Sequence, residues 1–387
     1  MLLRIKIVKY VERLNMNKPK LRSSVSVVDL NDNIIEFFLT NTRRQVRIKI
    51  TSKKILDLIL NLDGELTIDE IVNKYNIDLE TKEYLIKFLN YLESKSIIED
   101  NIYIDIEEGN KYRRVINFIG DFSSSKVETK RMWSNIRNSH VVIIGLGAVG
   151  SWVSSLLVQN GIKEFTLIDN DTVDITNLHR QFGFSENDIG LLKTDVIEKR
   201  LKEFNRNVKV NKINKFLDEN LLDNNIDYKV DLIINCADKP NVDTTSMWVG
   251  EYCMKNNIPH IIGGGYNLHL SLIGQTIIPF KSACVKCFEK ELSRINEIDT
   301  KTLRKLNIKN RKIGSFGPMC SIIASMIAME SVKVLSKNII PANLNRRGEF
   351  NIYNMDIKYY NIERDDTCEW CSKEGKYGKL YERNRSN

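Results

Sequence analysis

A charged segment in the middle of the chain carries the residue types that handle phosphate. The run DNDTVDITNLHRQFGFSENDIGLLKTDV, residues 169–196, contains Asp171, Asn177, Arg180, Gln181 and Lys193. Arginine pairs bidentately with phosphate oxygens and lysine acts as a point charge, so this cluster suits a triphosphate and the charge that develops when its phosphorus is attacked. A solvated charged loop is the alternative explanation of the same residues.

A glycine-rich loop precedes this segment. In VVIIGLGAVGSW, residues 141–152, an apolar run leads into Gly145, Gly147 and Gly150. The first glycine permits a tight turn, the second lets backbone approach phosphate, and the third allows close packing of helix on strand. Asp169, which closes the run TLID, is expected to accept the ribose hydroxyls. The loop alone predicts a dehydrogenase, whereas the charged cluster favours a nucleotide that is cleaved.

Asp238 ends another apolar run, LIINCAD. If that run is a parallel strand, Asp238 lies at the carboxyl edge of the sheet, where α/β proteins bind ligands. The alternative is an N-cap for the helix expected after Pro240.

Two cysteine pairs predict a metal site. Cys284-x-x-Cys287 and Cys368-x-x-Cys371 supply four thiolates, the ligand set of a closed, structural and non-catalytic zinc site. Cys236 and Cys253 fall in apolar patterns and are interpreted as core residues.

Bulk composition limits the protein class. The chain has 387 residues, 42% hydrophobic and 28% charged, with no apolar run near the roughly 20 residues of a membrane span. Its net charge of +8 is spread along the chain and no nucleic-acid motif accompanies it, so we expect neither a membrane nor a nucleic-acid partner. The N-terminus lacks a secretory signal pattern, which indicates a cytoplasmic protein.

The elements that must position these residues form two expected domains. From Val141 onward strand and helix patterns alternate, which predicts an α/β fold with a doubly wound, mostly parallel Rossmann-like sheet. The first hundred residues instead predict a small winged-helix-like module: short strands, a turn at Asn31–Asn33, and helices, one with a capping box from Thr67 to Glu70. The expected domains are residues 1–108 and 109–387.

Over residues 111–371 the sequence resembles the ThiF/MoeB family, relatives of ubiquitin-activating enzymes. The motifs that carry this resemblance are GLGAVG, DNDTVDITNLHRQ, Lys193, the NCAD run and the paired cysteines. Members activate a C-terminal carboxylate with ATP, forming an acyl-adenylate and pyrophosphate. The resemblance implies Asp169 on the ribose and Asp238 on Mg²⁺. It implies phosphate contacts from Asn177, Arg180, Gln181 and Lys193, with Asp171 beside the nucleotide.

The same resemblance implies a homodimer. Members use an arginine of the partner subunit from an Arg-Tyr-x-Arg segment, which here reads Lys111-Tyr112-Arg113-Arg114. Arg114 matches the second arginine and lysine replaces the first.

The remaining features limit the class of substrate. Members that pass substrate to a thioester or persulfide carry a cysteine in the loop after the first zinc pair, and residues 288–314 contain none. Cys320 opens an apolar helix pattern and is expected to be buried. The N-terminal module resembles PqqD-type elements that bind leader peptides by adding a strand at SVSVV or EFFLT.

A PqqD-like module joined to a ThiF-like domain resembles peptide nucleotidyltransferases of the microcin C type, which adenylate the C-terminal asparagine of a short ribosomal precursor peptide. The resemblance implies a succinimide intermediate and a final phosphoramidate. ATP is the expected nucleotide, CTP stays open, and Gly263–Gly265 are a candidate approach for the peptide terminus. The alternatives are an activator of a ubiquitin-like sulfur carrier, a non-catalytic scaffold that presents a peptide, and ATP-driven dehydration or crosslinking of peptide side chains.

Overall fold

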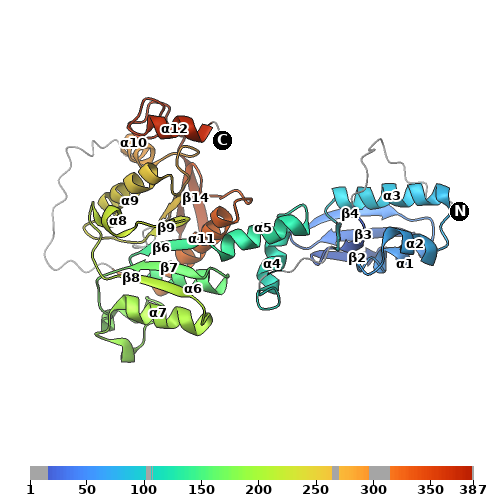
Figure 1. Ribbon diagram of the computed structural model, residues 1–387, viewed down its shortest axis with the longest axis horizontal. Coiled ribbons are helices and arrows are strands. Elements are labelled where there is room, and N and C mark those ends of the chain that lie inside the picture. Colours follow the sequence, from blue (N-terminus) through green and yellow to red (C-terminus); the bar gives the residue numbers. More distant parts are fainter. Residues whose placement is uncertain (1–15, 102–105, 107, 264–269, 296–313, 386–387) are drawn as a thin grey trace. The chain divides into compact units, whose positions relative to one another are not determined.

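A computed structural model describes residues 16–101, 106, 108–263, 270–295 and 314–385. The chain forms two compact units, Met1–Ser134 and Asn135–Asn387 (Figure 1). Each unit has its own buried hydrophobic core, as the length and composition predict.

Unit 1 contains a three-stranded antiparallel sheet in the order β2-β3-β4, a second pair β1-β5, and helices beside them. The elements are β1 Pro19–Leu21, β2 Val25–Asp29, β3 Ile34–Leu39, β4 Arg44–Lys49, α1 Lys53–Leu60, α2 Ile68–Lys74, α3 Leu79–Ser94, β5 Ile98–Asp100 and α4 Arg113–Gly120.

Local signals account for these elements. The turn between β2 and β3 has positive φ at Asn31, Asp32 and Asn33, residue types that tolerate the left-handed region. The capping box between Thr67 and Glu70 opens α2, as predicted. The apolar stripe of α3 is buried, as helical spacing requires, at Leu85, Phe88, Leu89 and Leu92.

Unit 2 is built on a six-stranded sheet in the order β12-β10-β9-β6-β7-β8, parallel except for β12. This confirms the predicted fold class. Its helices and strands are β6 His140–Ile144, α6 Gly150–Gln159, β7 Glu164–Ile168, η1 Ile175–Asn177, η2 Glu186–Asp188, α7 Lys193–Phe204, β8 Lys209–Ile213, α8 Leu221–Asn225, β9 Leu232–Asn235, α9 Val242–Asn256, β10 His260–Ile262, β11 Leu270–Ile273, β12 Thr276–Ile277, α10 Val285–Ile295, α11 Gly317–Ser336, β13 Arg346–Asn351, β14 Asp356–Asn361 and α12 Gly378–Arg385.

The strand order reverses at β6. The chain runs outward through β7 and β8 on one side of β6, and through β9 and β10 on the other. Right-handed crossovers therefore place α6 and α7 on one face of the sheet and α9 on the other. Side-by-side packing of α6 with α7 and α11, and of α9 with α8 and α10, agrees with this arrangement. The reversal opens a crevice at the carboxyl end of β6.

Helix α11 is the most apolar long helix among the described residues. By length and composition it would suffice to cross a membrane, but 61% of its apolar window is buried inside the protein. It packs against α6, β9 and β11, which is the role of a core helix.

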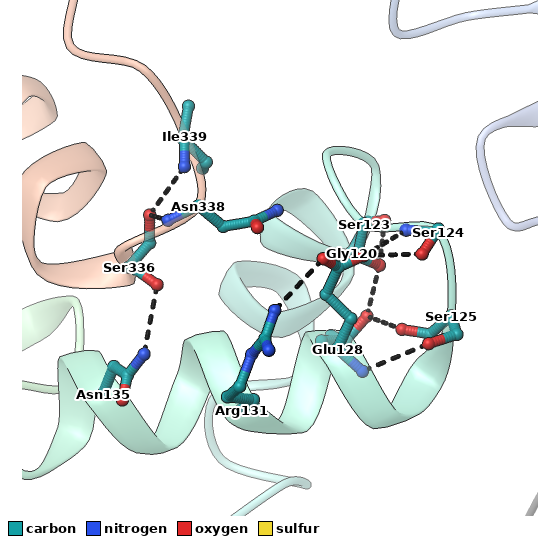
Figure 2. A network of polar contacts seen from close by, with 11 residues as sticks. Gly120, Ser123, Ser124, Ser125, Glu128, Arg131, Asn135, Ser336, Asn338 and Ile339 are labelled. Carbon is teal, nitrogen blue, oxygen red and sulfur yellow. Dashed lines mark hydrogen bonds and ion pairs between the residues drawn. The ribbon is translucent and has the colours of Figure 1, made fainter. Parts of the chain in front are cut away.

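The division between the units falls within α5, Lys126–Arg137. In unit 1, the Ser124 amide donates to Glu128 Oε2 (2.6 Å) and the Glu128 amide to Ser125 Oγ (3.2 Å). In unit 2, Asn135 Nδ2 donates to the carbonyl oxygen of Ser336 at 3.2 Å. Figure 2 shows both sets of contacts. The functional boundary expected between residues 108 and 109 stays a prediction.

His260 gives the fold a predicted acid sensitivity. It is fully buried on β10, and burial lowers its pKa to about 4. Because the unfolded chain binds this proton near pH 6.5, stability is present above that pH and is lost as pH falls toward 4. We expect wild type to lose about 2 kcal/mol more than His260→Asn between about pH 7.5 and 5, measured by urea unfolding.

The matched control is His179→Asn, since His179 is exposed. An identical pH dependence in wild type and His260→Asn would contradict the assignment.

Candidate active site

A cavity of about 260 Å³ lies at the carboxyl edge of the parallel sheet in unit 2, where β6, β7, β8 and β9 end. It occupies the crevice created by the reversal of strand order. The predicted residues that line it are Gly145, Gly147, Asp169, Asp171, Asn177, Arg180, Gln181, Lys193 and Asp238. The glycine loop, the charged segment 169–196 and Asp238, three separate parts of the sequence, thus converge on one site.

The glycine loop shapes one wall of the cavity. Gly145 has φ +85°, and a Cβ there would lie 2.8 Å from the backbone of Cys236. A Cβ on Gly150 would lie 1.9 Å from the Gly145 carbonyl oxygen, whereas one on Gly147 would meet nothing within 4 Å. Gly147 therefore presents open backbone to the cavity at the start of α6, the arrangement that suits an anion.

Asp169 holds this loop in place. One carboxylate oxygen accepts the Leu146 amide at 2.6 Å, and the other accepts the Asp171 amide at 2.7 Å. Burial raises the pKa of the Asp169 carboxyl, and nearby Lys193 opposes that shift. Each oxygen retains a lone pair for a further donor, such as a ribose hydroxyl.

Lys193 is the buried cation of the site. It begins α7, where the helix dipole disfavours a positive charge, and its side chain is only 6% exposed. Its Nζ lies 3.1 Å from Asp171 Oδ2. Burial alone would raise the pKa of the Asp171 carboxyl, but Lys193 and Lys239 hold it below its ordinary value. A lysine kept in so unfavourable a place is better explained by an anionic ligand than by stability.

The segment with Arg180 is fixed against α6. Phe182 stacks on Trp152 with ring centroids 4.1 Å apart. Asn177 is buried, and its Oδ1 accepts the Asp174 amide at 3.1 Å. Arg180 donates to the Thr176 carbonyl, so its guanidinium is tethered at one nitrogen.

Two buried polar atoms of this segment lack partners. Arg180 Nε and Gln181 Oε1 have no hydrogen-bond partner among the described residues. Buried polar atoms are ordinarily satisfied. Together with the open backbone at Gly147, these atoms fit a bound nucleotide.

The structure excludes one of the two interpretations of Asp238. The N-cap of α9 is Asn241, whose side chain accepts the Thr244 amide at 2.9 Å. The alternative that Asp238 caps this helix is therefore wrong. Asp238 is exposed and lines the cavity, where its carboxylate is available to a metal–nucleotide complex.

Sequence reasoning missed several residues that line the cavity, among them Lys239 and Phe216. Lys239 directly follows Asp238, and its adjacency to that residue is the only signal that pointed to it. Phe216 follows β8 in a loop with no motif.

Other predicted residues lie elsewhere. Arg114 is exposed on α4 in unit 1, and its role across a dimer stays a prediction. Cys320 is fully buried in the first turn of α11, where burial raises the pKa of its thiol. Of the three glycines proposed near the peptide terminus, Gly263 is buried beside Cys236, and Gly264 and Gly265 lie outside the described residues.

The four paired cysteines form a cluster with the geometry of a zinc site. Their sulfurs lie within 4.8 Å of one another. Three of the S···S distances are 3.8, 3.5 and 3.5 Å. Zn–S bonds of about 2.3 Å give tetrahedral edges of about 3.8 Å, so the cluster is compatible with one Zn²⁺. The pair at Cys368 and Cys371 is thereby held against the start of α10.

We predict one zinc ion per chain, bound for structure. Chelation is expected to lower the melting temperature by at least about 5 °C, because the metal binds only the folded cluster. Cys368→Ser should lose the metal and Cys253→Ala, a buried cysteine outside the cluster, should keep it, measured by elemental analysis. Equal zinc content in both variants would contradict the assignment.

Comparison with known proteins agrees with the fold. The ThiF family model matches residues 118–370, more than half of the chain. The tRNA threonylcarbamoyladenosine dehydratase of Haemophilus influenzae is 35% identical over 153 residues, which cover 39% of this chain and 58% of that protein. The molybdopterin-synthase adenylyltransferase of Escherichia coli is 26% identical over 243 residues, 62% of this chain and 89% of that protein. The chain spans about half of several other curated relatives, for example 49% of the adenylyltransferase and sulfurtransferase UBA4 of Lodderomyces elongisporus.

Solved structures extend the likeness to both units. E. coli MccB with ATP superposes with a TM-score of 0.71 at 24% identity, covering 92% of this chain and 100% of that one. The microcin C7 biosynthetic enzyme MccB in complex with N-formylated MccA gives the same TM-score at 23% identity, with the same coverage. At this identity the likeness shows a shared fold. The match of the family model, together with the cavity it covers, establishes that this chain belongs to the ThiF family.

Proposed function

We propose that the protein is an ATP-dependent nucleotidyltransferase that activates the C-terminus of a short ribosomal precursor peptide. The observation that carries this proposal is the buried cation Lys193 beside Arg180 in the cavity under the glycine loop. Two cations that line one nucleotide cavity suit a triphosphate that is cleaved. A hydride-transfer enzyme would require an apolar slot there.

The reaction follows from these charges. A peptide carboxylate attacks the α-phosphorus of ATP, a P–O bond forms, and pyrophosphate leaves with the electron pair of the broken P–O bond. Arg180 and Lys193 stabilise the charge that develops on the phosphate oxygens, and no general base is needed because the carboxylate is already ionised. Asp238 would hold Mg²⁺, which would offset charge on the departing pyrophosphate.

The peptide is proposed to bind in unit 1. β3 is paired on both sides, by β2 and by β4, so the predicted alternative at EFFLT is wrong. The outer edge of β2, within SVSVV, pairs with no other described strand. Strand addition there would supply main-chain hydrogen bonds, in keeping with a PqqD-like role. The solved MccB complex with N-formylated MccA supports a peptide substrate.

The proposal has two further parts. The product is microcin C-like, and the protein is a homodimer in which Arg114 acts across the interface. The product would be a peptide carrying a stable nucleoside monophosphate, formed through a C-terminal succinimide. ATP is the first choice of nucleotide because an MccB structure was solved with ATP, and CTP is the second.

A second candidate is activation of a ubiquitin-like sulfur carrier. This candidate is favoured by the match to the molybdopterin-synthase adenylyltransferase, which covers 89% of that protein. Transfer to a thioester or persulfide would fall to Cys320, which is buried with a raised pKa. Adenylation without transfer is therefore the better explanation of the chain.

Mass spectrometry of peptide products tests the proposal. The protein, MgATP or MgCTP, and short peptides encoded beside the gene are incubated, with a synthetic peptide ending in asparagine as a defined substrate. We expect a stable added nucleoside monophosphate, and none with Asp238→Ala. Water loss alone would favour dehydration, and no product with any peptide or nucleotide would favour a scaffold. In a parallel incubation with a ubiquitin-like carrier protein, an adenylated carrier together with an unmodified peptide would favour the second candidate.

A proline in β2 tests the peptide-binding edge. The amides of Thr40 and Leu30 donate to the carbonyls of Ser24 and Ile34, at 2.8 and 2.9 Å. Alternation in an antiparallel pair then turns the Val27 amide toward the open edge. Val27→Pro should remove an outward donor without breaking the sheet and weaken peptide binding at least about tenfold, measured by fluorescence anisotropy.

The control is Gln45→Pro on β4. The amide of Ile50 donates to the Asn33 carbonyl at 2.7 Å, so the same alternation turns the Gln45 amide outward at the opposite edge. Equal peptide affinity in wild type and Val27→Pro, or an equal loss in both variants, would exclude β2 as the site.

A further inference from the structure

Lys239 crosses the mouth of the cavity. It lies in the loop between β9 and α9, and its Nζ is 3.1 Å from Asp171 Oδ1 and 3.4 Å from Oδ2. The same Nζ lies 5.2 Å from the centre of the Phe216 ring. One side chain thus connects the loops that follow β7, β8 and β9.

The two lysines that share Asp171 differ sharply in exposure. The Lys193 side chain is 6% exposed, whereas that of Lys239 is 64% exposed. The carboxylate therefore holds one cation inside the cavity and a second at its opening. An exposed pair such as Lys239–Asp171 contributes little to stability because water screens it.

Breaking the ion pair between Lys239 and Asp171 costs little electrostatic free energy. Asp171 would remain paired with Lys193 at 3.1 Å, so no carboxylate would be left without a cation. A triphosphate carries several negative charges and attracts an ammonium group more strongly than one shared carboxylate does. The long, flexible lysine stem allows the exchange without movement of the backbone.

We propose that Lys239 is a second phosphate-binding lysine, held on Asp171 in the free protein and transferred to the outer phosphates when the nucleoside triphosphate binds. This inference rests on the proposed function. The outer phosphates are the partners because Lys239 stands at the mouth of the cavity, while Lys193 lies deep beside the glycine loop. Its neighbour Asp238, the proposed Mg²⁺ ligand, lines the same cavity.

Calorimetry with the full chain tests this role. MgATP and MgCTP are titrated into the wild-type protein, and the better ligand is compared with its own monophosphate. Lys239→Ala should weaken triphosphate binding about tenfold and change monophosphate binding less than about twofold, because only the triphosphate has outer phosphates. Lys239→Arg should restore most of the triphosphate affinity.

Lys255→Ala is the matched control. Lys255 is also an exposed lysine paired with an aspartate, Asp223 at 2.7 Å, with a side chain 56% exposed. Lys255→Ala changes the net charge by the same amount as Lys239→Ala. It should leave the affinities for triphosphate and monophosphate unchanged.

Four results would overturn the inference. Unchanged triphosphate affinity in Lys239→Ala would show a surface ion pair only. Equal weakening of triphosphate and monophosphate, or equal losses in Lys239→Ala and Lys255→Ala, would show a general effect rather than a contact with outer phosphates. Absence of binding of any nucleoside triphosphate to the wild-type protein would instead remove the proposed function, and this inference with it.

Discussion

The hydrogen bond from the Leu146 amide to the Asp169 carboxylate, at 2.6 Å, is the contact on which the site depends. It joins the glycine loop after β6 to the end of β7 and fixes the backbone that faces the cavity. The same carboxylate orders the next turn through the Asp171 amide. Because Asp171 in turn binds Lys193 and Lys239, the position of both cations follows from where β7 ends.

The charges of the cavity are arranged for a ligand rather than for the stability of the free protein. Three features of the cavity are each unfavourable in isolation. Lys193 lies at the N-terminus of a helix. Arg180 Nε and Gln181 Oε1 are buried without hydrogen-bond partners among the described residues. They gather where the strand order reverses, and Trp152 and Phe182 hold the arginine segment there. A rigid scaffold that keeps unfavourable polar groups in place is what electrostatic catalysis requires.

Features set by local chemistry could be predicted from the sequence. The glycine spacing, the capping box at Thr67 and the cysteine pairs each reflect a constraint within a few residues, and the strand–helix alternation specified the parallel sheet. Features set by pairing between distant segments could not. The central place of β3 in its sheet and the ion pair of Lys239 with Asp171 both depend on which segments the fold brings together.

The central claim is that this cavity cleaves a triphosphate reversibly at the α-phosphorus. Exchange of labelled pyrophosphate into ATP or CTP, measured with and without a peptide substrate, tests it most directly because exchange requires formation of the adenylate or cytidylate and its reversal. The account predicts peptide-dependent exchange that is lost in Lys193→Met. Peptide-dependent exchange that persists in Lys193→Met, or its absence with both nucleotides although the peptide binds, would contradict it.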